Sequence, residues 1–165
     1  MEQLVQEILH LPAVNERLLK LRDDISASIQ SHGLRASGKT QRSMVVQQTG
    51  DTIGLYTTRP FFQSLETGSR GWTGYTGVHC TFKEFKEIIR QWARDKGLNF
   101  ANDDKTLGAI TYTIIHHGTK TYRQGGRNDI YSQLLVECFF DLSDIMQRKF
   151  GDIVTESMLR FTQPI

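Results

Sequence analysis

The chain has 165 residues, of which 38% are hydrophobic and 23% are charged, and this composition fits one domain with its own core. Its 20 basic and 18 acidic residues leave a net charge of +2, which is too balanced to predict strong non-specific binding to nucleic acid. No apolar run reaches the length of about 18 residues that a membrane-spanning helix needs, so no membrane contact is expected.

The first part of the chain is predicted to be a long amphipathic helix over residues 14–32. Gly33 is a natural stop at its C-terminal end. A shorter helix is expected before it, around residues 4–9, with a break near Pro12. The inward side chains of the long helix recur at helical spacing and are Val14, Leu18, Leu21, Ile25 and Ile29.

Residues 41–58 change to the period of β-strands. Two runs rich in β-branched residues flank the pair Gly50–Asp51, and such a pair predicts a tight hairpin turn because glycine tolerates a positive φ angle. The following residues, 59–80, contain a glycine at every third position from Gly68 to Gly77, with large side chains between them. We interpret this stretch as a loop on a permissive backbone.

Residues 81–96 give the clearest helical pattern. Thr81 and Glu84 form a T-x-x-E capping box, and Gly97 marks the end. The predicted apolar face consists of Phe82, Phe85, Ile88, Ile89, Trp92 and Ala93.

Two further helices are predicted over residues 104–117 and 129–160. Asp103 or Asp104 can cap the first, and a basic loop precedes the second. The chain is therefore expected to form a single α+β domain over residues 1–165, with a small antiparallel sheet containing a β-hairpin, packed against several helices that include a long C-terminal one. The apolar positions of that long helix include Leu134, Leu135, Cys138, Phe139, Leu142, Ile145, Met146 and Phe150.

The segment LRASGKTQ completes a Walker A pattern with Gly33, Gly38, Lys39 and Thr40. A phosphate-binding loop of that kind follows a buried strand and opens a helix, whereas this segment follows a helix and leads into a strand. The context therefore disfavours a nucleotide site. A small nucleotide- or nucleic-acid-binding protein that uses this loop and the basic loops remains the alternative function.

Histidines and cysteines give no pattern typical of a metal site or an enzyme. His79 with Cys80 and His116 with His117 are adjacent pairs, whose side chains point in different directions and do not chelate readily. A thiol nucleophile at Cys80 would need a histidine nearby in space, which the sequence does not fix. We predict no catalytic residues, no metal, no cofactor, and free thiols at both cysteines.

The loop over residues 59–80 is the strongest candidate for a binding surface. Trp72 and Tyr75 beside Arg70 could stack on single-stranded nucleic acid, but the same side chains are typical of protein interfaces. Because the net charge is near zero, the composition favours a protein partner.

Several short motifs between residues 36 and 72 occur together. They are a small-residue-glycine segment at Ser37 and Gly38 with Ser43 after it, the turn at Gly50, the pair Phe61–Phe62, and the run Leu65-Glu66-Thr67-Gly68-Ser69. This arrangement resembles the tail-completion or head–tail connector family of tailed bacteriophages, and the resemblance extends over about residues 36–125. The chain departs from many members by carrying further helices after the Glu-x-Gly signature.

The resemblance implies a structural virion protein, not an enzyme, that forms a ring in the neck as a head–tail connector, tail-completion or tail-terminator protein. It implies six or twelve copies of the chain in contact with portal or adaptor and tail proteins, with DNA passing through without sequence-specific binding. The expected location is the neck or tail junction of the virion, and the host cytoplasm during assembly. The predicted subunit or partner contacts are Phe61, Phe62, Leu65, Glu66, Arg70, Trp72, Tyr75, Tyr122 and Arg123.

Overall fold

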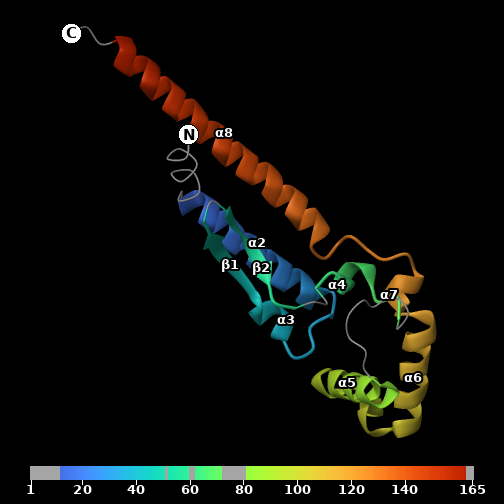
Figure 1. Ribbon diagram of the computed structural model, residues 1–165. Helices are drawn as coiled ribbons and strands as arrows, with labels where there is room; N and C mark the ends of the chain where they lie inside the picture. Colours follow the sequence, from blue (N-terminus) through green and yellow to red (C-terminus); the bar gives the residue numbers. More distant parts are fainter. Residues whose placement is uncertain (1–11, 51, 60–61, 72–80, 163–165) are drawn as a thin grey trace.

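The computed structural model describes residues 12–50, 52–59, 62–71 and 81–162 (Figure 1). These residues form a small α+β fold with a two-stranded antiparallel sheet, several helices and a long C-terminal helix, as the sequence predicts. The predicted short helix around residues 4–9 lies outside the described residues. No helix of the described residues has the length and apolar character needed to cross a membrane.

Helix α2 (Pro12–Ser31) supplies the centre of the main core. It ends where the backbone amides of Gly33 and Leu34 donate to the carbonyls of Gln30 and Ile29, and Gly33 has a φ of 64°. The five inward positions predicted from helical spacing are confirmed, since each is buried: Val14, Leu18, Leu21, Ile25 and Ile29.

The hairpin consists of β1 (Met44–Thr49) and β2 (Thr52–Thr57), with Thr49 opposite Thr52 and Gly50 at φ 56°, which confirms the predicted turn. Side chains alternate between the two faces of the sheet. One face packs against the core around α2 through Met44, Val46, Ile53 and Leu55. On the other face, the cross-strand neighbours Val45 and Tyr56 are exposed.

Helix α8 (Ser132–Thr162) runs antiparallel to α2 and continues past its N-terminal end (Figure 1). Arg17 near the start of α2 donates to Asp141 at 2.6 Å, and His32 after its end lies 3.2 Å from Asp129, just before α8. The side chains of α8 that join the main core all precede residue 146, and they are Leu134, Cys138, Leu142 and Ile145. The hairpin and the first half of α8 thus share the apolar stripe of α2.

A second helical unit consists of α5 (Phe82–Asp95), the short helix η2 (Asn99–Asn102) and α6 (Asp104–His117). The predicted capping box is present, because Thr81 Oγ1 accepts from the Glu84 amide and Glu84 Oε2 accepts from the Thr81 amide. Asp103 caps α6 by accepting from the Lys105 and Thr106 amides. The buried side chains of this unit are Ala93, Ala101, Leu107 and Thr111.

The predicted apolar face of α5 is only partly covered. Ala93 is buried, but Phe82, Ile88 and Trp92 are between 42% and 55% exposed. Among the described residues, η2 and α6 make the main contacts with α5, and they leave these three side chains of the apolar face exposed.

Three single helical turns lie in segments that the sequence suggested only weakly or as loops: α3 (Lys39–Arg42), α4 (Ser64–Thr67) and α7 (Lys120–Arg123). Helix α7 begins after Thr119, whose side chain accepts from the Tyr122 amide. These turns connect the long elements and place the Glu66 segment against the start of α8 (Figure 1).

Candidate protein-binding surface

The predicted contact residues fall into four groups in the structure, the fourth of which is the buried Glu66. Phe61, Trp72 and Tyr75 lie outside the described residues. Phe62 and Leu65 are half-buried at the edge of the main core, and the Phe62 ring lies 5.0 Å from that of Tyr131. The exposed ones are Arg70, Tyr122 and Arg123.

Glu66 is turned into the protein and is only 3% exposed. Its Oε1 accepts hydrogen bonds from the amides of Ile130 at 3.0 Å, Tyr131 at 2.7 Å and Ser132 at 2.9 Å, while Ser132 Oγ donates to Oε2. Both carboxylate oxygens therefore have internal partners, and this position gives no support to the predicted contact between Glu66 and another subunit.

The surroundings of Glu66 favour its ionised form. Burial alone raises the pKa of a carboxyl group, but the bonds from the Ser132 hydroxyl and from the amides of Ser132, Tyr131 and Ile130 together lower the pKa of Glu66 below its usual value. The carboxylate also lies at the N-terminus of a 31-residue helix, where negative charge is stabilised. Glu66 thus acts as a helix cap supplied from a distant segment of the chain.

The residues after Glu66 are fixed against α7. Ser69 and Thr119 exchange two bonds of 2.9 Å, from the Thr119 amide to the Ser69 carbonyl and from the Ser69 amide to Thr119 Oγ1. Gly68 has a φ of 69°, and a Cβ atom there would lie 2.3 Å from the Tyr122 nitrogen. The glycine of the Glu-x-Gly signature is therefore required by close backbone approach as well as by its φ angle.

This junction places three of the predicted contact side chains on the surface. Arg70 follows the anchored segment, and Tyr122 and Arg123 belong to the α7 turn that Gly68 touches. Arg70, Tyr122 and Arg123 take part in no ion pair within the described residues. They form one candidate contact patch, which we call the α7 patch.

Helix α8 presents a second, larger candidate surface. In the structure, the apolar positions predicted for this helix are divided between two of its sides. Leu134, Cys138, Leu142 and Ile145 pack toward α2. The other side carries seven large apolar side chains that are between 41% and 69% exposed: Leu135, Val136, Phe139, Phe140, Met146, Phe150 and Val154. We call these seven residues the α8 outer face.

The α8 outer face is continuous along the helix. Leu135, Phe139, Met146, Phe150 and Val154 follow one another at steps of four or seven residues, which keeps them on one side. The rings of Phe139 and Phe140 lie 6.1 Å apart in an edge-to-face arrangement. At roughly half exposure, the seven side chains offer on the order of 600 Å² of apolar surface. This is as much as the largest patch on a typical monomer, and such patches mark interaction sites.

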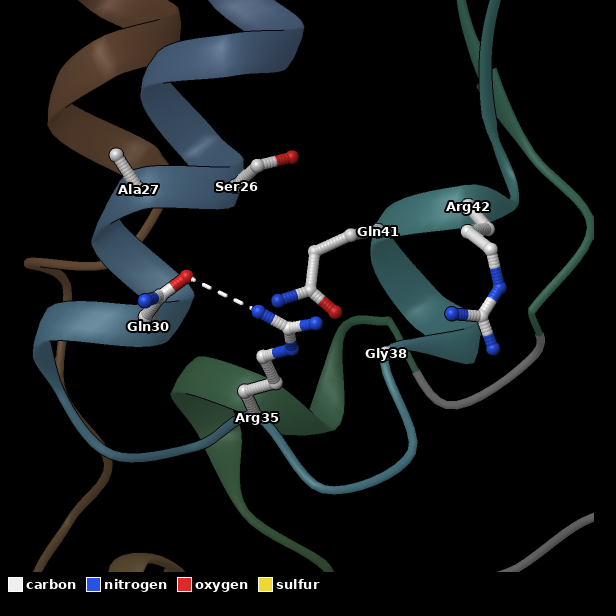
Figure 2. A pocket seen from close by; sticks show the side chains of 7 residues that line it. All are labelled: Ser26, Ala27, Gln30, Arg35, Gly38, Gln41 and Arg42. Atoms are coloured by element: carbon white, nitrogen blue, oxygen red, sulfur yellow. Dashed lines mark hydrogen bonds between the residues drawn. The ribbon is translucent and has the colours of Figure 1, made fainter.

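The Gly-Lys-Thr segment lies apart from both surfaces. It follows α2 and leads through α3 into β1, so the structure confirms that the context of a phosphate-binding Walker loop is missing. A cavity of about 230 Å³ nevertheless opens beside it between α2 and α3, lined by the side chains in Figure 2: Ser26, Ala27, Gln30, Arg35, Gly38, Gln41 and Arg42.

Comparison of the chain with protein-family models, curated proteins and solved structures found no match. Within the part of the chain that the structure describes, no three side chains of His, Cys, Asp or Glu gather as a metal site would require. Cys138 is a free thiol buried in the main core, whereas His79 and Cys80 lie outside the described residues.

Proposed function

We propose that this protein is a structural subunit of a tailed bacteriophage that forms a ring in the neck of the virion, as a head–tail connector, tail-completion or tail-terminator protein. The observation that carries the proposal is the α8 outer face, a run of exposed apolar side chains along a helix whose opposite side is already used by the core. A surface of this size and composition suits a protein partner.

A closed ring needs two different patches on each subunit, one of which meets the other on the next copy. The α8 outer face is one candidate, and the α7 patch is the second. In Figure 1, α7 lies beside α4, before the start of α8, whereas the outer face covers residues 135–154 of that helix. Two patches on different parts of one subunit are what a head-to-tail arrangement requires.

The Glu-x-Gly run that carries the resemblance has an internal role in this fold. Glu66 caps α8, and Gly68 permits contact with α7, so the signature sets the relative positions of the two candidate patches. A sequence motif of this kind fits a family whose members must present their contact surfaces in a fixed geometry.

The proposal is tested by measuring the mass of the full-length chain in solution with native mass spectrometry and imaging any oligomer by negative stain. We expect a discrete oligomer with a closed outline, in six or twelve copies as the resemblance implies. A chain that stays monomeric at high concentration, alone and in the presence of portal and tail proteins, would contradict the proposal.

A matched pair of variants separates assembly from folding. Phe139→Ser with Phe140→Ser changes two rings that are 69% and 63% exposed, so the monomer is expected to keep its thermal stability while the oligomer is lost. Val45→Ser, which removes an apolar side chain exposed on the hairpin, serves as the control and should leave the oligomer intact.

A further inference from the structure

The cavity beside Gly38 is lined by cationic and neutral polar side chains. Two of its seven lining side chains are arginines, two are glutamines, and none is acidic. Figure 2 shows that Arg35 and Gln41 point into the space between α2 and α3, with Gln30 opposite them. The cavity therefore combines fixed positive charge with neutral hydrogen-bonding groups.

The two guanidinium groups flank Gly38 on either side (Figure 2). A Cβ atom at this position would lie 3.1 Å from Arg42 Nη1 and 3.5 Å from Arg35 Nε. Gly38 is buried and has a φ of 72°, so the position suits glycine both in backbone conformation and in the space left for the two arginines. Two guanidinium groups beside one backbone position concentrate positive charge there, which favours a bound anion.

The described residues supply no such anion. Arg35 Nη1 donates to Gln30 Oε1 at 3.3 Å, and Arg42 Nη2 donates to the Ser37 carbonyl at 2.9 Å. Both acceptors are neutral. By contrast, four other arginines of the described chain form an ion pair with a carboxylate: Arg17, Arg22, Arg90 and Arg127.

We propose that Arg35 and Arg42, with Gln30 and Gln41, form a binding site for a phosphate group. A guanidinium presents parallel N–H donors whose spacing matches two oxygens of a phosphate, and two guanidiniums together can neutralise its charge. The amide groups of the glutamines add neutral donors. Because the groups that form the site come from side chains of α2, α3 and the loop between them, it differs from a Walker loop, in which backbone amides hold the phosphates.

The neighbouring surface continues the positive charge. A groove of about 550 Å³ between the Gly-Lys-Thr segment and α5 shares Arg35 and Gly38 with the cavity and adds Lys39 and Arg59. The acidic residue that lines it, Asp95, accepts a hydrogen bond from Gln91. A row of cationic groups beyond a single cavity suits the repeated phosphates of a nucleic-acid backbone, although the same cavity can take a free phosphate.

The experiment uses the full chain and two probes, which distinguish a phosphate group of a nucleic-acid backbone from free phosphate. Inorganic phosphate is titrated and followed by ³¹P NMR line width, and a fluorescein-labelled DNA duplex of random sequence is followed by anisotropy at several salt concentrations. The double variant Arg35→Gln/Arg42→Gln is compared with the wild type. Both arginines are exposed, and circular dichroism checks that the fold is kept. Arg148→Gln, an exposed arginine on α8, is the matched control.

We expect the double variant to bind the duplex at least tenfold more weakly. The plot of log affinity against log salt concentration has a negative slope, and this slope should become shallower by about two in the double variant. Each phosphate contact contributes about 0.9 to the size of the slope, and the variant loses two such contacts. A response to inorganic phosphate without duplex binding, lost in the same variant, would support the site and identify free phosphate as the source. The inference is overturned if neither probe binds, if wild type and double variant bind equally, or if polyglutamate competes as well as DNA. The site lies within one subunit, so these results do not depend on ring formation.

Discussion

The side chain of Glu66 and the backbone amide of Ser132 are joined by a hydrogen bond of 2.9 Å that connects α4 to the first residue of α8. The same oxygen also accepts from Ile130 and Tyr131, so one carboxylate fixes the entry into the longest helix of the protein. Stability, helix position and the geometry of the candidate contact surfaces therefore all depend on this residue.

Replacing Glu66 with alanine is expected to lower the free energy of unfolding by ~2–3 kcal/mol, because buried amides at the start of α8 lose their acceptor. Urea unfolding followed by circular dichroism measures the change. Glu137→Ala, an exposed glutamate on the same helix, serves as the control and should cost much less. Equal effects of the two substitutions would mean that the Glu66 cap contributes little.

The contribution of Glu66 depends on pH in a definite direction. Its pKa is lowered in the folded protein, so the folded state binds the proton less tightly than the unfolded chain, in which the value is near 4.5. The stabilisation is complete above that value and is lost as the pH falls through the lower folded-state pKa. We expect the difference in unfolding free energy between wild type and Glu66→Gln to be constant above about pH 6 and to shrink toward about pH 3. A difference that grows on acidification would contradict this assignment.

Gly68→Ala should destabilise the fold by more than ~2 kcal/mol, since the new Cβ would lie 2.3 Å from the Tyr122 nitrogen and the backbone has a positive φ. The variant Gly97→Ala separates the effect of the steric clash from the effect of the positive φ angle. Gly97 has a similar φ of 67°, but no atom lies within 4 Å of the point where alanine would place its Cβ, so only the conformational cost of ~1 kcal/mol is expected. Thermal and urea unfolding of both variants provide the comparison.

The thiol of Cys138 should react slowly in the native protein. It is only 2% exposed, and burial raises its pKa, so both access and the fraction of thiolate are reduced. In a Cys80→Ser background, labelling with a thiol reagent at about pH 8 is expected to be at least tenfold slower than in urea. Rapid labelling of the native variant would show that α8 separates readily from α2.

Local patterns predicted the elements well where neighbouring residues determine them. The stripe from Val14 to Ile29, the Gly50 turn, and the caps at Thr81 and Asp103 all depend on residues a few positions apart. The spacing of charged and apolar residues on one segment therefore contained enough information to place these helices and strands.

Relationships between distant segments could not be predicted in the same way. Nothing near Glu66 in the sequence indicates that its partners follow Asp129, and the role of Gly68 depends on a turn about fifty residues later. The two sides of α8 are also both apolar in sequence, and leucine occurs on each of them. Only the position of α2 decides that Cys138 is covered and Phe139 is not.

The length of α8 gives its anchoring a mechanical consequence. Thirty-one residues at 1.5 Å each make a rod of about 46 Å, and the core holds only its first half. Because the core holds α8 as far as Ile145, about 17 residues project beyond it over roughly 26 Å, and a tilt of about 10° at that point would carry the far end through about 4 Å. The direction in which the second half of α8 points therefore depends on how its first half packs against α2.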